Sequence, residues 1–163
     1  MKLVNALAIS IGLLAVVATW LFFGPLAALQ MQVWVAFIAW GAHFHNGGKV
    51  SGAIKTIAGM SLGAVVGALT IILTGQLGSL GSFAAPVAVG IGAAAFVLAA
   101  HIPLFSSIPC AAYGFSSVAG PILLKGVAPV DAILPCLASI ILGTLFAMVS
   151  EFIAGKLTEA GSP

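Results

Sequence analysis

The chain has 163 residues, of which 62% are hydrophobic and 5% are charged, with a net charge of +2. A soluble domain carries about 25% charged residues, and spanning segments of roughly 20 residues leave little of this length for a catalytic domain. The five basic residues are all lysines, too few for a surface that binds nucleic acid. We therefore expect a membrane protein that contacts the lipid bilayer, is not an enzyme and has no nucleic-acid partner.

Two long stretches carry no charged residue, from Lys2 to Lys49 and from Lys55 to Lys125. Proline and glycine divide them into segments, because proline lacks an amide proton and clashes with the preceding helical turn. The first four predicted spanning segments are Leu3 to Phe23, Leu26 to Ala42, Ala53 to Thr74 and Phe83 to His101.

The fifth segment is irregular, since Pro109 and Pro121 bracket a stretch too short for a full crossing at 1.5 Å per residue. We predict that residues 103–120 form a short, broken or re-entrant segment. The last helix is predicted from Ala132 to Phe152, with Asp131 as its N-cap. Residues 1–154 then form one transmembrane domain, and residues 155–163 form a polar C-terminal tail.

The fold class is all-α, a polytopic transmembrane bundle of about six segments. Cytoplasmic loops are enriched in lysine and arginine. With six segments, four lysines share one side (Lys2, Lys49, Lys55 and Lys156), which places both termini in the cytoplasm and leaves Lys125 outside. Five crossings would move the C-terminus outside, which fits Lys156 less well.

A glycine stripe in the third segment predicts close helix packing. Gly59, Gly63 and Gly67 recur every four residues, and small residues let helix backbones approach in lipid. The partner helix is in the same protomer or in a second subunit, and the intramolecular alternative is favoured. Because so small a bundle encloses at most a narrow conduit, we also expect homo-oligomers.

The irregular fifth segment is the candidate solute path. Breaks at membrane depth free backbone groups, which are tolerated where they are buried in protein or line a watery cavity. A kinked packing helix is an equally weighted alternative. The candidate path residues are His101, Ser106, Ser107, Pro109, Tyr113, Ser116 and Ser117.

Three titratable residues, His43, His45 and Glu151, are candidates for gating or pH sensing, since imidazole titrates near neutrality. Glu151 lies near a segment end, so exposure to water is a simpler explanation of its place. No carboxylate or thiolate is close in sequence to the histidines, so we predict no metal site and no cofactor. The run Asn46-Gly47-Gly48-Lys49 superficially resembles an anion cradle, but it lacks the spacing of a nucleotide-binding loop and is interpreted as a turn.

Two elements carry a family resemblance: the Gly47-Gly48-x-x-x-Gly52 turn into a glycine-rich helix, and Ser107-Ile108-Pro109-x-x-x-x-Gly114. With the segment layout, they make the chain resemble the YcdZ-like family of bacterial inner-membrane proteins, domain of unknown function 1097. A more distant likeness is to the membrane halves of fusaric-acid-resistance and aromatic-acid exporters. Lys55 stands where those exporters tend to have arginine, and their large cytoplasmic domain is absent. The resemblance implies a bacterial inner-membrane protein concerned with transport.

We therefore expect an oligomeric channel or facilitator for a small neutral or weakly charged solute. The alternative is a non-conducting membrane subunit that packs against a larger complex through its glycine seams.

Overall fold

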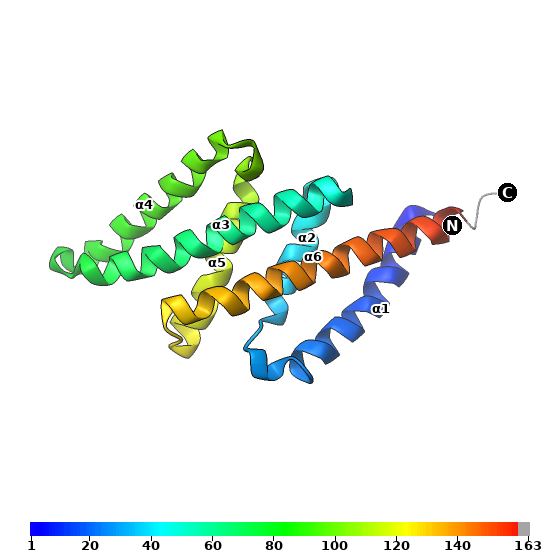
Figure 1. Ribbon diagram of the computed structural model, residues 1–163, viewed down its shortest axis with the longest axis horizontal. Helices are drawn as coiled ribbons and strands as arrows, with labels where there is room; N and C mark the ends of the chain where they lie inside the picture. Colours follow the sequence, from blue (N-terminus) through cyan, green and yellow to red (C-terminus); the bar gives the residue numbers. More distant parts are fainter. Residues whose placement is uncertain (160–163) are drawn as a thin grey trace.

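The computed structural model describes residues 1–159, which are helical and contain no β-strand (Figure 1). The all-α prediction is confirmed. The six α-helices are α1 (Leu3–Phe23), α2 (Val33–His45), α3 (Lys49–Gln76), α4 (Ala84–Leu98), α5 (Ile108–Lys125) and α6 (Pro129–Glu159). Short 3₁₀ turns lie at Ala27–Leu29, Gly78–Phe83, Ala99–His101 and Pro103–Phe105.

Four helical stretches within the described residues are long and apolar enough to cross a bilayer: Leu3–Phe23, Lys49–Gln76, Gly78–His101 and Pro129–Thr158. Their outward faces carry many large apolar side chains, such as Val16, Leu69, Ile91 and Phe152. In water such faces would be costly, whereas lipid tails accept them. The four helices indicate a membrane protein.

Two helices are short. The predicted second segment starts late, because residues 26–32 form a 3₁₀ turn and an extended stretch before α2 begins at Val33. The fifth segment is short, as predicted, but it is one continuous helix. Pro109 lies in its first turn, where the missing amide proton costs nothing, and Pro121 lies within it. The irregular backbone is at residues 99–107.

The last helix is longer than predicted at both ends. It begins at Pro129, so Asp131 lies in its first turn and is not the N-cap. It continues to Glu159 through the start of the predicted tail at Gly155. Residues 160–163 of that tail lie outside the described residues.

The six helices form two halves of three that are related by an approximate two-fold rotation. In Figure 1 a half-turn about the viewing direction exchanges α1 with α4, α2 with α5 and α3 with α6. The contacts follow the same rule: α5 packs mainly on α3 and α2 mainly on α6, while α4 lies against α3 and α1 against α6. Helices α3 and α6 pack on each other at the centre. Helices α3 and α6 run in opposite directions, so the two halves form an inverted repeat, which is hard to see in the sequence.

The burial pattern repeats when Val33 is aligned with Ile108 and Lys49 with Pro129. Both members are buried in eight pairs of α3 and α6: Gly52 and Ala132, Thr56 and Cys136, Gly59 and Ser139, Met60 and Ile140, Gly63 and Gly143, Ala64 and Thr144, Gly67 and Ala147, and Thr70 and Ser150. A Cβ on Gly63 would collide with the carbonyl oxygen of Ala111, and one on Gly143 with that of Ala36. These two carbonyls are themselves equivalent, so the same close crossing occurs in each half.

The centre of the molecule is apolar. Val35, Met60, Cys110 and Ile140 are completely buried in one apolar cluster to which both halves contribute. Cys110 and Cys136 are buried free thiols.

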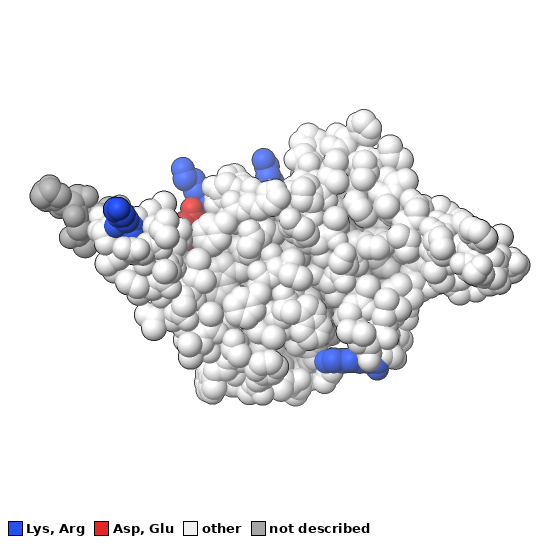
Figure 2. All heavy atoms as spheres, turned by 180° about the vertical axis from the view of Figure 1, so that it is seen from behind, with Lys and Arg blue, Asp and Glu red and all other residues white. Residues whose placement is uncertain are grey.

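The lysines lie at two ends. The Met1 ammonium donates to the Leu157 carbonyl (3.3 Å), which brings Lys2 and Lys156 together. Lys125 lies over the ring of Trp34 at the start of α2, far along that helix from the turn that carries Lys49. Figure 2 shows basic groups along the upper edge and left end, and another on the lower edge. We call the end with Lys2, Lys49, Lys55 and Lys156 the lysine end.

Candidate functional site

A polar cluster lies at the lysine end, where the α2–α3 turn meets the start of α5. Its hub is Asn46, at the C-terminus of α2. The Asn46 Nδ2 donates to the Ala42 carbonyl (3.0 Å) and lies 2.9 Å from Thr56 Oγ1 and 3.0 Å from Cys110 Sγ. The Ser107 hydroxyl donates to Asn46 Oδ1 (2.8 Å). We call Asn46, Thr56, Ser107 and Cys110 the Asn46 cluster; it ties α2, α3 and α5 together with its side-chain amide fully used.

Glu151 closes the same end from α6. Its Oε2 accepts from the backbone amide of Lys49 (2.8 Å) and lies 2.9 Å from Nε2 of His43. The His43 side chain is completely buried, while that of Glu151 is 33% exposed. The carboxylate thus caps the N-terminus of α3 from another helix, where the helix dipole and free amides favour negative charge.

The turn that holds this carboxylate is unusual. Gly47, Gly48 and Lys49 have successive positive φ angles of 86°, 67° and 58°. Lys49 is strained there, because a side chain disfavours this region. Gly48 has φ 67° and ψ −161°, a conformation that a side chain strongly disfavours, so glycine is required at that position. The run is a turn, as predicted, and its Lys49 amide binds a carboxylate of the protein's own.

The structure brings some predicted site residues together and leaves others apart. His43 meets Glu151, Ser107 meets Asn46, and the Tyr113 hydroxyl lies 3.3 Å from Nδ1 of His45. By contrast, three of the predicted path residues are exposed at the α4–α5 connection and the start of α5: His101, Ser106 and Pro109.

The middle of α5 is packed against the glycine stripe of α3. A Cβ on Gly59 would lie 2.8 Å from Cys110 Cβ, and one on Gly67 would lie 2.7 Å from the Phe115 carbonyl oxygen. Ser116 is exposed and lines a cavity of 370 Å³ between α3, α4 and α5, together with Thr70. Ser117 is buried, and its hydroxyl has no hydrogen-bond partner among the described residues.

A second polar site lies at the opposite end, around Gln32. This side chain is 3% exposed, and its Oε1 has no partner among the described residues. Its Nε2 donates to the Gln30 carbonyl, and its backbone amide donates to Ser139 Oγ (2.8 Å). A cavity of 170 Å³ adjoins it, lined by Leu29, Gln30, Gln32, Pro121, Lys125, Val127, Asp131, Ala132 and Pro135. We call this the Gln32 cavity.

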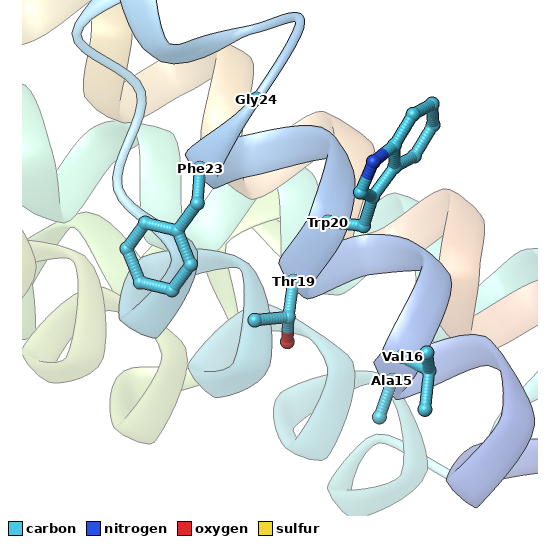
Figure 3. Close-up of a pocket in the computed structure, with 6 residues that line it drawn as sticks. All are labelled: Ala15, Val16, Thr19, Trp20, Phe23 and Gly24. Atoms are coloured by element: carbon cyan, nitrogen blue, oxygen red, sulfur yellow. The ribbon is translucent and has the colours of Figure 1, made fainter.

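A hollow of 660 Å³ along α1 is a different kind of feature. It lies along α1 alone, and Figure 3 shows its side chains fanning outward from that helix without converging on a centre. Trp20 and Phe23 are 64% and 73% exposed, and the polar side-chain groups shown there are the Thr19 hydroxyl and the Trp20 indole N–H. This surface suits lipid tails better than a polar solute.

Several functional-site candidates escaped the sequence analysis. Asn46 was considered only as part of a turn, and Gln32 was not singled out. Trp40 is 4% exposed and donates from Nε1 to Ser150 Oγ (3.0 Å). Polar side chains at the ends of apolar helices were the available signal for Asn46 and Gln32.

Within residues 1–159, no three histidine, cysteine, aspartate or glutamate side chains are grouped closely enough to hold a metal ion. Hydrogen-bonding groups lie at both ends of the apolar core. They include neutral amides and hydroxyls, with the Glu151 carboxylate at the lysine end and Asp131 and Lys125 at the other.

Comparison with known proteins gives one clear result. No curated protein and no solved structure matches the chain significantly, so the exporter likeness has no support from them. The family model described as "Protein of unknown function (DUF1097)" matches residues 8–155, which include all six helices in whole or in large part. The chain belongs to the DUF1097 family.

Proposed function

We propose that the protein is a facilitator or channel for a small neutral or weakly charged solute, in a bacterial inner membrane with both termini cytoplasmic. The observation that carries this proposal is the pair of polar sites at equivalent places in the inverted repeat, one at each end of an apolar layer. Inverted repeats recur in transporters, where solute sites lie at the interface of the repeats.

The physical argument comes from the cost of desolvation. A polar solute that leaves water needs hydrogen-bonding groups on each side of the bilayer, and an apolar constriction between them stops leakage. The Asn46 cluster and the Gln32 cavity supply such groups, and Val35, Met60 and Ile140 supply the constriction. The described conformation is then a closed one.

In this proposal the Asn46 cluster is the gate at the lysine end. Its Ser107–Asn46 hydrogen bond joins α5 to α2, and the Glu151 contacts with His43 and Lys49 join α6 to the α2–α3 turn. Protonation of His43 or Glu151 would change the charge at this junction, which makes them the candidate pH sensors. His45 with Tyr113 lies on the outer side of the same turn.

One observation favours the alternative of a non-conducting subunit. The outer helices α1 and α4 are the least buried of the spanning stretches, with 22% of the residues buried in the most apolar window of each. Such helices present long apolar faces to lipid, to further copies of the chain or to another membrane protein.

Flux into proteoliposomes tests the proposal. Vesicles with and without the purified protein are given an inward osmotic gradient of acetamide, urea, glycerol, acetate or ammonium, and light scattering follows their swelling. Faster swelling for one or more neutral solutes is expected. Rates equal to those of empty vesicles for every solute, with the protein folded, would reject it. Co-purification of a fixed partner would then support the subunit alternative, and mass determination in detergent tests for homo-oligomers.

A matched pair of variants tests the gate. Ser107→Ala removes the hydroxyl that bonds Asn46, so the closed state is weakened and solute flux should rise. Ser82→Ala changes an exposed serine in the α3–α4 connection and should leave flux unchanged. Equal flux in both variants and the wild type would show that the cluster is not a gate.

A further inference from the structure

We infer that the Gln32 cavity binds a small neutral molecule with a carboxamide or urea group. The inference rests on the proposed function, because it names the class of solute. Its observations are the unpartnered Oε1 of a buried glutamine, the adjoining cavity, and the two-fold relation between this cavity and the Asn46 cluster.

The two-fold relation shows what is missing from the cavity. In the alignment of α2 with α5, Asn46 corresponds to Pro121 and Ser107 to Gln32. Gly52 correspondingly matches Ala132 in α6. Asn46 and Ser107 are bonded beside Gly52, and the equivalent three residues line the Gln32 cavity. A proline therefore stands where the carboxamide of the other half is found, and space remains beside it.

Because the carboxamide is missing, position 121 supplies no hydrogen-bond donor. At the lysine end, Asn46 Nδ2 donates to the Ala42 carbonyl one turn earlier. At the other end, Pro121 has neither an amide proton nor a side-chain donor for the equivalent carbonyl of Ser117. Because Gln32 Nε2 is directed to the Gln30 carbonyl, the orientation of the amide leaves Oε1 as an unused acceptor. A buried acceptor without a partner is costly, and an N–H donor from a ligand would remove that cost.

The charges at the cavity favour a neutral ligand. Lys125 and Asp131 are both exposed and both line it, so their opposite charges offset each other for an ion of either sign. A volume of 170 Å³ equals the share of roughly five or six water molecules in the liquid, enough for a molecule of four heavy atoms such as acetamide or urea. Acetamide is also the side chain of asparagine with a hydrogen in place of Cα, and thus the group that Pro121 lacks.

Saturation-transfer NMR on the full-length protein in lipid nanodiscs tests the inference. The methyl signal of acetamide is expected to receive saturation from the protein, above the level of empty nanodiscs, and urea is expected to compete. Acetate has nearly the same shape but carries a charge and lacks N–H donors, so it should receive much less. No transfer to acetamide would mean that the cavity holds water alone, and equal transfer to acetate would mean that the amide is not recognised; either result overturns the inference.

Two variants locate the binding. Gln32→Leu removes the unpartnered acceptor and should weaken acetamide binding roughly fivefold, the equivalent of one neutral hydrogen bond. Gln76→Leu, the same change at an exposed position at the end of α3, is the matched control and should have no effect. Val127→Phe fills the cavity with Gln32 intact and should abolish binding. Unchanged affinity in Val127→Phe would overturn the inference even if Gln32→Leu fails to fold.

Binding and flux are separate measurements. Acetamide binding that depends on Gln32, without any flux, would retain the site and reject the proposed facilitator. Selective flux of another solute, without acetamide binding, would retain the facilitator and reject this site.

Discussion

The Asn46 cluster and the Gln32 cavity occupy equivalent places in the two halves, yet they differ in how their polar groups are satisfied. At the lysine end a serine, an asparagine and a threonine from three helices bond one another. At the opposite end, the equivalents of those residues are a glutamine, a proline and a cysteine, and an acceptor is left over beside a cavity. The two halves thus share a backbone framework but differ in the chemistry at its ends: the polar groups of one end bond one another, and those of the other do not.

The helix packing between the two ends is similar in the two halves, and glycine substitutions, which have the largest expected effect, test this similarity. Gly63→Val and Gly143→Val each place a side chain against a helix backbone that cannot move aside, so each should cost about 3 kcal/mol or more. Gly75→Val, in open space near the end of α3, is the control. Thermal unfolding in detergent measures all three. A large loss of stability in one of the two variants and none in the other would show that the two helix contacts are not equivalent.

The next largest effect concerns the carboxylate that is found at the lysine end. Glu151→Gln removes the charge that caps α3 and faces His43, and the side chain's partial exposure limits the loss to about 1–2 kcal/mol. Asp131→Asn removes an exposed carboxylate in the first turn of α6 and should cost less. If thermal unfolding shows equal losses of stability in the two variants, the contacts with Lys49 and His43 stabilise the Glu151 carboxylate no more than solvent does.

The next test gives the Gln32 end the asparagine that the lysine end has. Pro121→Asn restores the missing amide proton and side-chain carboxamide, so it should stabilise the protein by about 1 kcal/mol and prevent acetamide binding at the Gln32 cavity. Pro86→Asn, in the exposed first turn of α4, should do neither. Thermal unfolding and saturation transfer are the measurements. A stabilised protein that still binds acetamide would show that acetamide does not occupy the place of the carboxamide that position 121 lacks.

The smallest effect is a change in thiol reactivity. Cys110 and Cys136 are both buried, but only Cys110 has an amide of the Asn46 cluster within 3.0 Å. Asn46→Ala should therefore speed labelling of Cys110 by a small maleimide severalfold and leave Cys136 unchanged, as peptide mass spectrometry can resolve. Equal acceleration at both thiols would indicate general loosening of the core.

Much of the fold was predictable, because apolar run length and proline or glycine breaks decide where a chain crosses lipid. The first helix was predicted at Leu3 to Phe23, as observed, and the short fifth segment was anticipated. The inverted repeat was not predictable, since its matching positions exchange residue types freely, as Thr56 with Cys136. What they share is burial, which a single sequence does not reveal.

The site was predicted only in part. His43, Ser107 and Glu151 were singled out for their chemistry, but their partners depend on tertiary contacts between residues far apart in the chain. The two prolines of the fifth segment were expected to break it at membrane depth. Pro109 instead sits where a helix needs no amide donor, and α5 continues past Pro121.

The two-fold rotation has a consequence for how the chain enters the membrane. Turning the molecule upside down exchanges its halves and restores nearly the same arrangement of helices, so packing alone gives little preference for either insertion direction. That choice falls to the lysines, four of which lie at one end and Lys125 at the other. Five exposed lysine side chains, which contribute almost nothing to the core, thus favour one of the two insertion directions, and with it the side of the membrane that each polar site faces.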